Sequence, residues 1–161
     1  MSTIREPGLD LLGATRALPG GSLVEVPADS PPSAVATRIL LVDDDPSFVE
    51  MLQTALLDYD DFEVVGTALN GREAYERAVE LKPALILMDV SMPLLDGVEA
   101  TRLMQNLPDP PTVVLITGEE VEASDAAAYE AGAAAYLRKS DDLPMLIGVI
   151  VAVSRLAALP A

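Results

Sequence analysis

Polar side chains able to bind metal, attack an electrophile or hold an anion stand directly after short apolar runs. Asp89 ends the run 85–88 and precedes the turn-forming pairs Met92-Pro93 and Asp96-Gly97. Taken alone, Asp89 could equally close a strand or cap the following turn. Other apolar runs end in the same way, in a polar residue or an acidic pair: Asp43 with Asp44, Thr117, and Lys139.

If the apolar runs are parallel strands, their carboxyl ends meet at one edge of a sheet. The polar residues that follow them would then lie in one cleft. Three carboxylates in one cleft raise each other's pKa unless a cation lies among them. Mg²⁺ suits such oxygen ligands. Lys139 adds a mobile positive charge that can pair with Asp89 or with an added anion, and Thr117 adds a hydroxyl donor. Such a set can attack phosphorus and hold the resulting acyl phosphate.

The elements that must position these residues alternate along the chain. Buried strands are predicted at 38–42, 62–68, 85–89, 112–117 and 134–139. Helices are predicted to begin at Pro46, after the cap Asn70, at Gly97, near Val121, and after Asp141 or Asp142. Five strands alternating with five helices predict an α/β fold, a doubly wound parallel sheet of the flavodoxin-like type.

The first helix has an apolar face that predicts its inward side. The spacing i, i+3, i+4, i+7, i+8 assigns five residues to this side: Phe48, Met51, Leu52, Ala55 and Leu56. The second helix, stopped by Pro83, directs Ala74, Ala78 and Leu81 inward. The third is expected to end near Asn106 and the fourth near Glu130.

Composition excludes several classes of function. The chain has 161 residues, half of them hydrophobic, a formal net charge of −16, and neither His nor Cys. A Ser-His-Asp triad, a thiol nucleophile and a disulfide are therefore excluded, and zinc loses its usual nitrogen and sulfur ligands. The acidity argues against direct nucleic-acid binding. Because no secretory signal stands at the amino terminus, we expect a cytoplasmic protein.

The chain is predicted to divide near residue 37. Residues 1–36 are rich in Pro, Gly and Ser, which is typical of a flexible extension. Within it, 9–18 could form a short helix and 23–26 a strand. Residues 37–158 form the folded domain, and 159–161 a tail.

The motifs around these strand ends closely resemble the receiver domain of two-component response regulators. The resemblance covers about 38–158 and rests on five motifs: Ile39-Leu-Leu-Val-Asp-Asp-Asp-Pro46, Leu87-Met-Asp-Val-Ser-Met-Pro93 with Asp96-Gly97, Leu115-Ile-Thr-Gly118, Glu130-Ala-Gly-Ala133, and Tyr136-Leu-Arg-Lys139. It implies a sheet order of 2-1-3-4-5. It also implies phosphorylation by a sensor histidine kinase or a phosphotransfer protein, and no catalytic turnover beyond self-catalysed phosphorylation and hydrolysis.

The resemblance also implies a role for each residue at the edge. Asp89 is the phosphoacceptor and, with Asp44, Asp43 (mainly through water) and the Ser91 carbonyl, surrounds Mg²⁺ or Mn²⁺. Lys139 contacts the phosphoryl group, and Thr117 and Tyr136 transmit the switch. Ser91 and Glu119 are placed to tune hydrolysis of the acyl phosphate.

The chain departs from the family pattern at two positions. Gly118 stands where Ala is commoner after the Thr, and Ser140 stands where many receivers have a cis Pro after the Lys. Because a cis bond before a residue other than Pro costs about 3–4 kcal/mol, we expect Lys139–Ser140 to be trans.

Two other functions compete with phosphoacceptance. A haloacid-dehalogenase-like phosphatase would use Asp43-Asp-Asp45, Thr117, Lys139 and Asp141-Asp142, but it leaves Asp89 and Met92-Pro93 without a role. A receiver-like interaction module that is never phosphorylated is the second competitor. A phosphoryl mimic distinguishes the receiver from the phosphatase: a receiver would trap it on Asp89, and the phosphatase on Asp43.

The last helix, 143–158, is apolar over most of its circumference, with Arg155 as its one charge. A stripe suited to packing on the sheet is formed by Leu146, Ile150, Val153 and Ala157, and it is flanked by Ile147 and Val151 on one side and by Val149 and Leu156 on the other. The uncharged run is shorter than the roughly 20 residues of a membrane span. We therefore predict no membrane span, and a homodimer or another protein contact through this helix.

Overall fold

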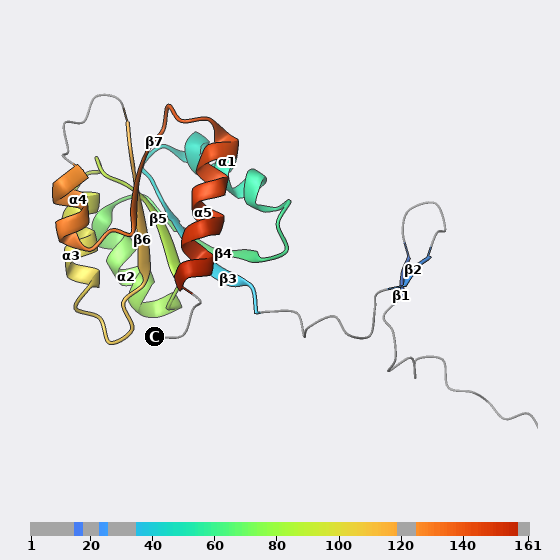
Figure 1. Ribbon diagram of the computed structural model, residues 1–161. Helices are drawn as coiled ribbons and strands as arrows, with labels where there is room; N and C mark the ends of the chain where they lie inside the picture. Colours follow the sequence, from blue (N-terminus) through green and yellow to red (C-terminus); the bar gives the residue numbers. More distant parts are fainter. Residues whose placement is uncertain (1–14, 18–22, 26–34, 119–124, 158–161) are drawn as a thin grey trace, which may run out of the picture. The chain divides into compact units, whose positions relative to one another are not determined.

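The computed structural model describes residues 15–17, 23–25, 35–118 and 125–157, and the chain separates into two compact units, Met1–Val35 and Ala36–Ala161 (Figure 1). In the first unit, β1 (Thr15–Ala17) pairs antiparallel with β2 (Leu23–Glu25). The short helix predicted over 9–18 is therefore wrong at Thr15–Ala17, where the backbone instead pairs with a second strand. The rest of 1–36 lies outside the described residues, so a flexible extension there stays a prediction.

The second unit is built on a parallel sheet of five strands. The strands are β3 (Thr37–Val42), β4 (Phe62–Ala68), β5 (Leu85–Asp89), β6 (Thr112–Thr117) and β7 (Ala135–Arg138). They lie in the order β4-β3-β5-β6-β7, with every neighbouring pair parallel. Counting only these five, the order is 2-1-3-4-5, which confirms the predicted fold class.

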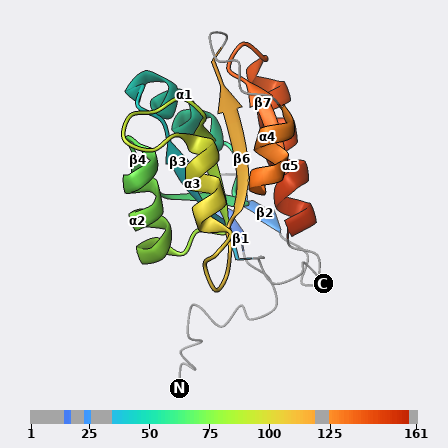
Figure 2. The ribbon, with the colours of Figure 1, turned by 90° about the vertical axis from the view of Figure 1, so that its left-hand side faces the viewer.

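Five helices connect the strands and cover both faces of the sheet. They are α1 (Pro46–Leu56), α2 (Gly71–Leu81), α3 (Gly97–Met104), α4 (Asp125–Ala131) and α5 (Leu143–Ala157). Helices α1 and α5 lie on one face and α2, α3 and α4 on the other (Figure 1). Figure 2 views the face covered by the three helices. This two-sided cover explains why β5 is buried along its whole length.

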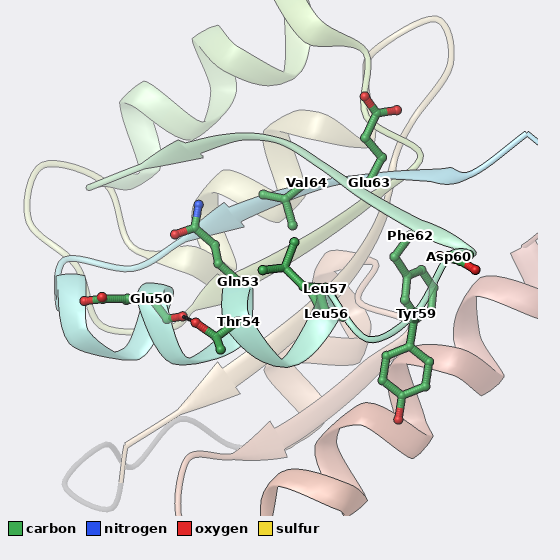
Figure 3. Close-up of a pocket in the computed structure, with 10 residues that line it drawn as sticks. All are labelled: Glu50, Gln53, Thr54, Leu56, Leu57, Tyr59, Asp60, Phe62, Glu63 and Val64. Atoms are coloured by element: carbon green, nitrogen blue, oxygen red, sulfur yellow. Dashed lines mark hydrogen bonds between the residues drawn. The ribbon is translucent and has the colours of Figure 1, made fainter. Parts of the chain in front are cut away.

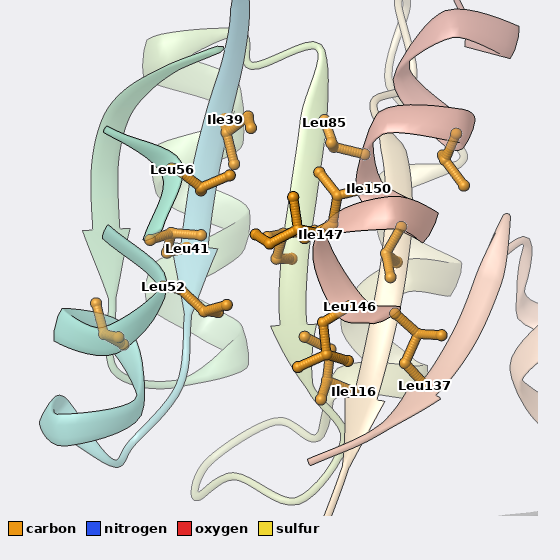
Figure 4. Close-up of a cluster of buried hydrophobic side chains, with 14 residues drawn as sticks. Ile39, Leu41, Leu52, Leu56, Leu85, Ile116, Leu137, Leu146, Ile147 and Ile150 are labelled. Atoms are coloured by element: carbon orange, nitrogen blue, oxygen red, sulfur yellow. The ribbon is translucent and has the colours of Figure 1, made fainter. Parts of the chain in front are cut away.

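Each face of the sheet has its own apolar core. Between the sheet and α1 and α5, the core contains large aliphatic side chains such as Leu41, Leu52 and Ile150 (Figure 4). The opposite core is rich in alanine, including Ala74, Ala100 and Ala128. Small side chains allow three helices to lie close together on that face, where α3 contacts both α2 and α4.

Side-chain caps fix where the helices begin. The carboxylates of Asp45, Asp96 and Asp142 and the amide oxygen of Asn70 each accept a backbone N–H from the first turn of α1, α3, α5 and α2. Asp142, one of the two predicted candidates, is thus the cap of α5. Asp45 and Asn70 follow the ends of β3 and β4 within three residues, so these two caps close short loops at the carboxyl edge.

Several predicted helix details are wrong. Met51 is 40% exposed and Val49 is buried in its place, so α1 is rotated from the face assigned by spacing. Ile147, expected to flank the inward stripe of α5, is buried in the core, whereas Ala157 is exposed. Helix α3 ends at Met104 rather than near Asn106. Helix α4 is described from Asp125, and residues 119–124 lie outside the described part.

A surface groove of about 670 Å³ runs between α1 and the start of the edge strand β4 (Figure 3). Leu57 and Val64 line its apolar part, and Glu50 and Glu63 are among its polar residues. The groove lies beside the amino end of β4, and none of the strand-end residues singled out by the sequence lines it. Within the described ranges, no helix has the length and apolarity needed to cross a membrane.

Candidate functional site

Backbone pairing brings the predicted residues to one edge of the sheet. The N–H of Asp43 donates to Ala68, that of Val90 to Ile116, and that of Lys139 to the Thr117 carbonyl, over 2.8–3.1 Å. These bonds continue the strand pairing past the last residues of β3, β5 and β7. The side chains that follow the strands therefore leave the sheet at one level, as predicted.

Asp43, Asp89 and Lys139 form a compact charged group. The Lys139 Nζ lies 2.7 Å from Asp43 Oδ2 and 3.4 Å from Asp89 Oδ2. The two carboxylate side chains are only 3% and 6% exposed, and that of Lys139 is 23% exposed. Sequence reasoning anticipated the pairing with Asp89, but the closer partner of the ammonium is Asp43.

The donor set fits a hard divalent cation. Carboxylate oxygens of Asp43, Asp44 and Asp89 lie within 4.8 Å of one another, and Asp44 is exposed to solvent. The buried Asp43 Oδ2 is paired with the Lys139 ammonium at 2.7 Å and has no other partner among the described residues. A buried carboxylate oxygen with unused lone pairs beside two further carboxylates is the arrangement that Mg²⁺ or Mn²⁺ binds.

The surroundings of the acceptor raise its pKa. Burial, followed by the charge of Asp43, raises the pKa of Asp89 from 3.8 to about 6, although Lys139 opposes this. Burial also raises the pKa of Asp43. For Lys139, burial lowers the pKa, but contacts with Asp43 and Asp89 outweigh it, so the net pKa lies above the ordinary value. A bound divalent cation would reverse the cost of ionising these carboxyl groups.

The two predicted switch residues lie on the neighbouring strands β6 and β7. Thr117 ends β6, is buried, and donates its hydroxyl to the Gly118 carbonyl at 3.1 Å. Tyr136, on β7, is half-buried and packs against the alanine-rich core. The hydroxyl of Thr117 is thus held by a weak local bond and stands one residue beyond Ile116, the register partner of Asp89.

The loop from β5 to α3 is held tightly against the acceptor. Asp89 Oδ1 accepts the Ser91 N–H at 3.3 Å, and the Gly97 N–H donates to the Val90 carbonyl at 2.8 Å. A Cβ on Gly97 would lie 2.2 Å from the Asp89 carbonyl oxygen, so only glycine fits there. At the loop apex Leu94 has φ 69° and a hydrogen bond joins Leu95 N–H to the Pro93 carbonyl, which makes a strained γ-turn.

Two further predictions concern Glu119 and the peptide bond that follows Lys139. Glu119 lies outside the described residues. The described residues contain no cis peptide bond, so Lys139–Ser140 is trans, as expected. Sequence reasoning missed the role of Phe48, whose ring lies under the Lys139 ammonium with 4.8 Å between Nζ and the ring centroid. The helical spacing had assigned Phe48 simply to the core.

Comparisons with known proteins agree with this geometry. The family described as "Response regulator receiver domain" matches residues 39–150. The chain is 34% identical over 116 residues to the transcriptional regulatory protein LnrK of Bacillus subtilis, covering 72% of this chain and 53% of that protein. It is 40% identical over 114 residues to the response regulator GacA of Pseudomonas viridiflava, covering 70% and 53%.

Solved structures share the fold. The signal receiver domain of the putative response regulator NarL from Mycobacterium tuberculosis superposes with a TM-score of 0.69 at 28% identity, covering 74% of this chain and 97% of that one. The response regulator domain of Thermotoga maritima CheB gives 0.68 at 28% identity, covering 79% and 100%. The chain spans about half the length of the two curated relatives named above.

Proposed function

This chain belongs to the family of response regulator receiver domains, and we propose that it accepts a phosphoryl group on Asp89 in a reaction that requires Mg²⁺ or Mn²⁺. The observation that carries the proposal is the group of three carboxylates whose oxygens lie within 4.8 Å of one another, with one ammonium among them. Membership of this family, together with the position of Asp89 at the end of a central strand, disfavours the haloacid-dehalogenase-like alternative.

The proposed step is an attack by an Asp89 carboxylate oxygen on phosphorus. With a phosphohistidine donor, an O–P bond forms, the P–N bond breaks, and the departing imidazole nitrogen takes up a proton. A divalent cation held by Asp43, Asp44, Asp89 and the Ser91 carbonyl would neutralise charge on the phosphoryl oxygens. Lys139, which already reaches Asp89 at 3.4 Å, supplies a second positive charge to those oxygens.

The donor is proposed to be a sensor histidine kinase or a phosphotransfer protein in the cytoplasm. The receiver performs no other turnover: it catalyses its own phosphorylation and the hydrolysis of its acyl phosphate. Ser91, which lies in the β5–α3 loop two residues after Asp89, and Glu119 would set the rate of hydrolysis. Changed dephosphorylation rates in Ser91→Ala and Glu119→Ala would support this role, and unchanged rates would remove it.

Thr117 and Tyr136 are proposed to report the phosphorylation state. A ligand shifts a conformational equilibrium only through contacts that differ between the states. The Thr117 hydroxyl has such a choice, because its bond to the Gly118 carbonyl is weak and a phosphoryl oxygen is a stronger acceptor. Movement of Thr117 would then make room for the half-buried ring of Tyr136.

The outward side of α5 is proposed to form a homodimer contact, with another protein partner as the alternative. Met145 is 52% exposed and Leu156 is 68% exposed. Between them on the same side lie the exposed residues Gly148 and Ala152, so no charge interrupts this stripe. Light scattering on the full chain should show a dimer that Leu156→Glu disrupts. Leu57→Glu, at a leucine that is 80% exposed outside α5, should leave the dimer intact. A monomeric wild type would end the homodimer proposal.

Phosphoacceptance can be tested with a small donor. Incubation with phosphoramidate and Mg²⁺ should add one phosphoryl group to the wild type and none to Asp89→Asn. Asp96→Asn is a matched control, since Asp96 lies in the same loop but caps α3, and it should be labelled. A wild type that stays unlabelled under these conditions would favour the interaction-module alternative.

A further inference from the structure

The aromatic ring of Phe48 brings α1 into contact with the charged group at the carboxyl edge. Phe48 lies in the first turn of α1, directly after the loop that carries Asp43 and Asp44, and it packs against the aliphatic core. Its ring centroid is 4.8 Å from the Lys139 Nζ. The ammonium therefore contacts two carboxylates and the ring of an aromatic residue.

A bound divalent cation would affect the carboxylate contacts of the Lys139 ammonium differently from its contact with the Phe48 ring. The carboxylates of Asp43 and Asp89 that hold the ammonium also belong to the set that would bind the cation. The cation and the ammonium therefore compete for the same two carboxylates. The ring of Phe48 offers no ligand to a hard cation, but its face attracts an ammonium, so the ring contact can persist when the carboxylates are engaged by metal.

We propose that Phe48 is a positioning residue that keeps the Lys139 ammonium at the carboxyl edge when a divalent cation occupies the carboxylates. The ammonium is then already in place to meet an incoming phosphoryl oxygen. This inference rests on the proposed function, and it assigns to Phe48 a role beyond its contribution to the core. Within the described ranges, Phe62 is the other phenylalanine, half-buried against the same core, and it provides a matched control.

The test measures how tightly the full chain binds the phosphoryl mimic beryllofluoride in saturating Mg²⁺, by isothermal titration calorimetry. Loss of a cation–π contact corresponds to about a two- to five-fold weaker affinity, so Phe48→Leu should bind the mimic that much more weakly. Phe48→Tyr keeps an aromatic face and should bind like the wild type. Phe62→Leu removes a similar amount of packing and should also bind like the wild type.

A double-substitution cycle isolates the contact with Lys139. Lys139→Met removes the ammonium, and adding Phe48→Leu to it should cause no further loss of affinity for the mimic. In the metal-free chain, NMR should show ring-shifted ε-methylene protons of Lys139 in the wild type and in Phe48→Tyr but not in Phe48→Leu. This measurement reports the contact directly and does not depend on metal.

Three results would overturn the inference while leaving phosphoacceptance intact: mimic affinity in Phe48→Leu equal to that of the wild type, an equal loss in Phe48→Leu and Phe48→Tyr, or the same loss when Lys139 is Met. A wild type that binds no mimic and accepts no phosphoryl group from phosphoramidate would instead overturn the proposed function, and the role of Phe48 with it.

Discussion

The apolar layer between the sheet and α1 and α5 differs sharply from the carboxyl edge that it supports. In the layer, Ile39, Leu41 and Ile150 are 0–1% exposed and pack within one cluster of apolar side chains (Figure 4). At the edge, two nearly buried carboxylates share one ammonium, and Asp43 Oδ2 has no partner among the described residues besides that ammonium.

On β6 the boundary between the two regions is a single peptide bond, because Ile116 belongs to the layer and Thr117 to the edge. On β3 and β5 the residues before the edge, Val42 and Met88, belong instead to the alanine-rich core of the other face. Burying unbalanced charge costs stability, and the large aliphatic layer offsets that cost. The contrast shows that the two regions do different work. The layer holds the strands in register, and the edge holds an excess of negative charge whose energetic cost a bound cation would lower.

The largest expected effect lies in the layer. Ile150→Ala removes three methyl or methylene groups from a site with 0% exposure, and such truncations cost about 2–5 kcal/mol of unfolding free energy. Urea denaturation followed by circular dichroism measures the change. A loss much below this range would mean that α5 repacks easily and that the layer is less rigid than the contrast requires.

A smaller loss is expected where the edge touches the backbone. Gly97→Ala places a Cβ 2.2 Å from the Asp89 carbonyl oxygen, so the β5–α3 loop must shift, at a cost of about 1–3 kcal/mol. Gly148→Ala, compared on the Leu156→Glu background so that the proposed dimer contact is absent, is the control: its Cβ meets nothing within 4 Å, and alanine in a helix interior should add about 0.5–1 kcal/mol. Equal effects of the two substitutions would contradict the tight packing of the loop.

At the edge itself, removing a charge should stabilise the metal-free chain. With a pKa of about 6, Asp89 is ionised at pH 7.5 against the cost of burial and the charge of Asp43. Asp89→Asn removes that cost and should raise the unfolding free energy by about 1–2 kcal/mol in EDTA. A fall in stability would show that the contact with Lys139 outweighs the repulsion.

The same substitution predicts a dependence on pH. Because the pKa of Asp89 is about 6 in the folded chain and 3.8 is its ordinary value, the folded state retains a proton that the unfolded state loses between these values. The contribution of Asp89 to stability is therefore present below about pH 4 and falls as pH rises toward 6. The difference in Tm between Asp89→Asn and the metal-free wild type should widen over that interval and then stay constant. A constant difference throughout would contradict the raised pKa.

Added Mg²⁺ should reverse this effect. A ligand that binds only the folded chain raises its stability, and the carboxylate form of Asp89 is the form that binds a cation. The gain in Tm on adding Mg²⁺ should therefore be larger at pH 7.5 than at pH 5, and Asp89→Asn should show a smaller gain. Equal gains in wild type and Asp89→Asn would place the bound cation elsewhere.

The sequence predicts the edge better than it predicts the layer. Asp43, Asp89, Thr117 and Lys139 follow apolar runs, and because parallel strands end at one level, their meeting follows from topology alone. Helix rotation does not follow in this way. An apolar arc as wide as that of α1 or α5 can face the sheet at several angles, which is why Val49 and Ile147 proved buried and Met51 exposed.

The side-chain contacts at the edge also cannot be predicted from the spacing of residues in the sequence. The closer pairing of Lys139 with Asp43 depends on where a long, flexible side chain settles among competing carboxylates. The contact with Phe48 depends on the rotation of α1. Both are set by packing in three dimensions, which leaves no periodic signal in the chain.

Mapping the phosphorylated residue tests phosphorylation at Asp89 most directly. The full chain is treated with phosphoramidate and Mg²⁺, the acyl phosphate is reduced with borohydride, and the modified aspartate, now homoserine, is located by peptide mass spectrometry. Conversion of Asp89, abolished when EDTA replaces Mg²⁺, is the expected result. Conversion of Asp43 in place of Asp89, or of no aspartate, would contradict it.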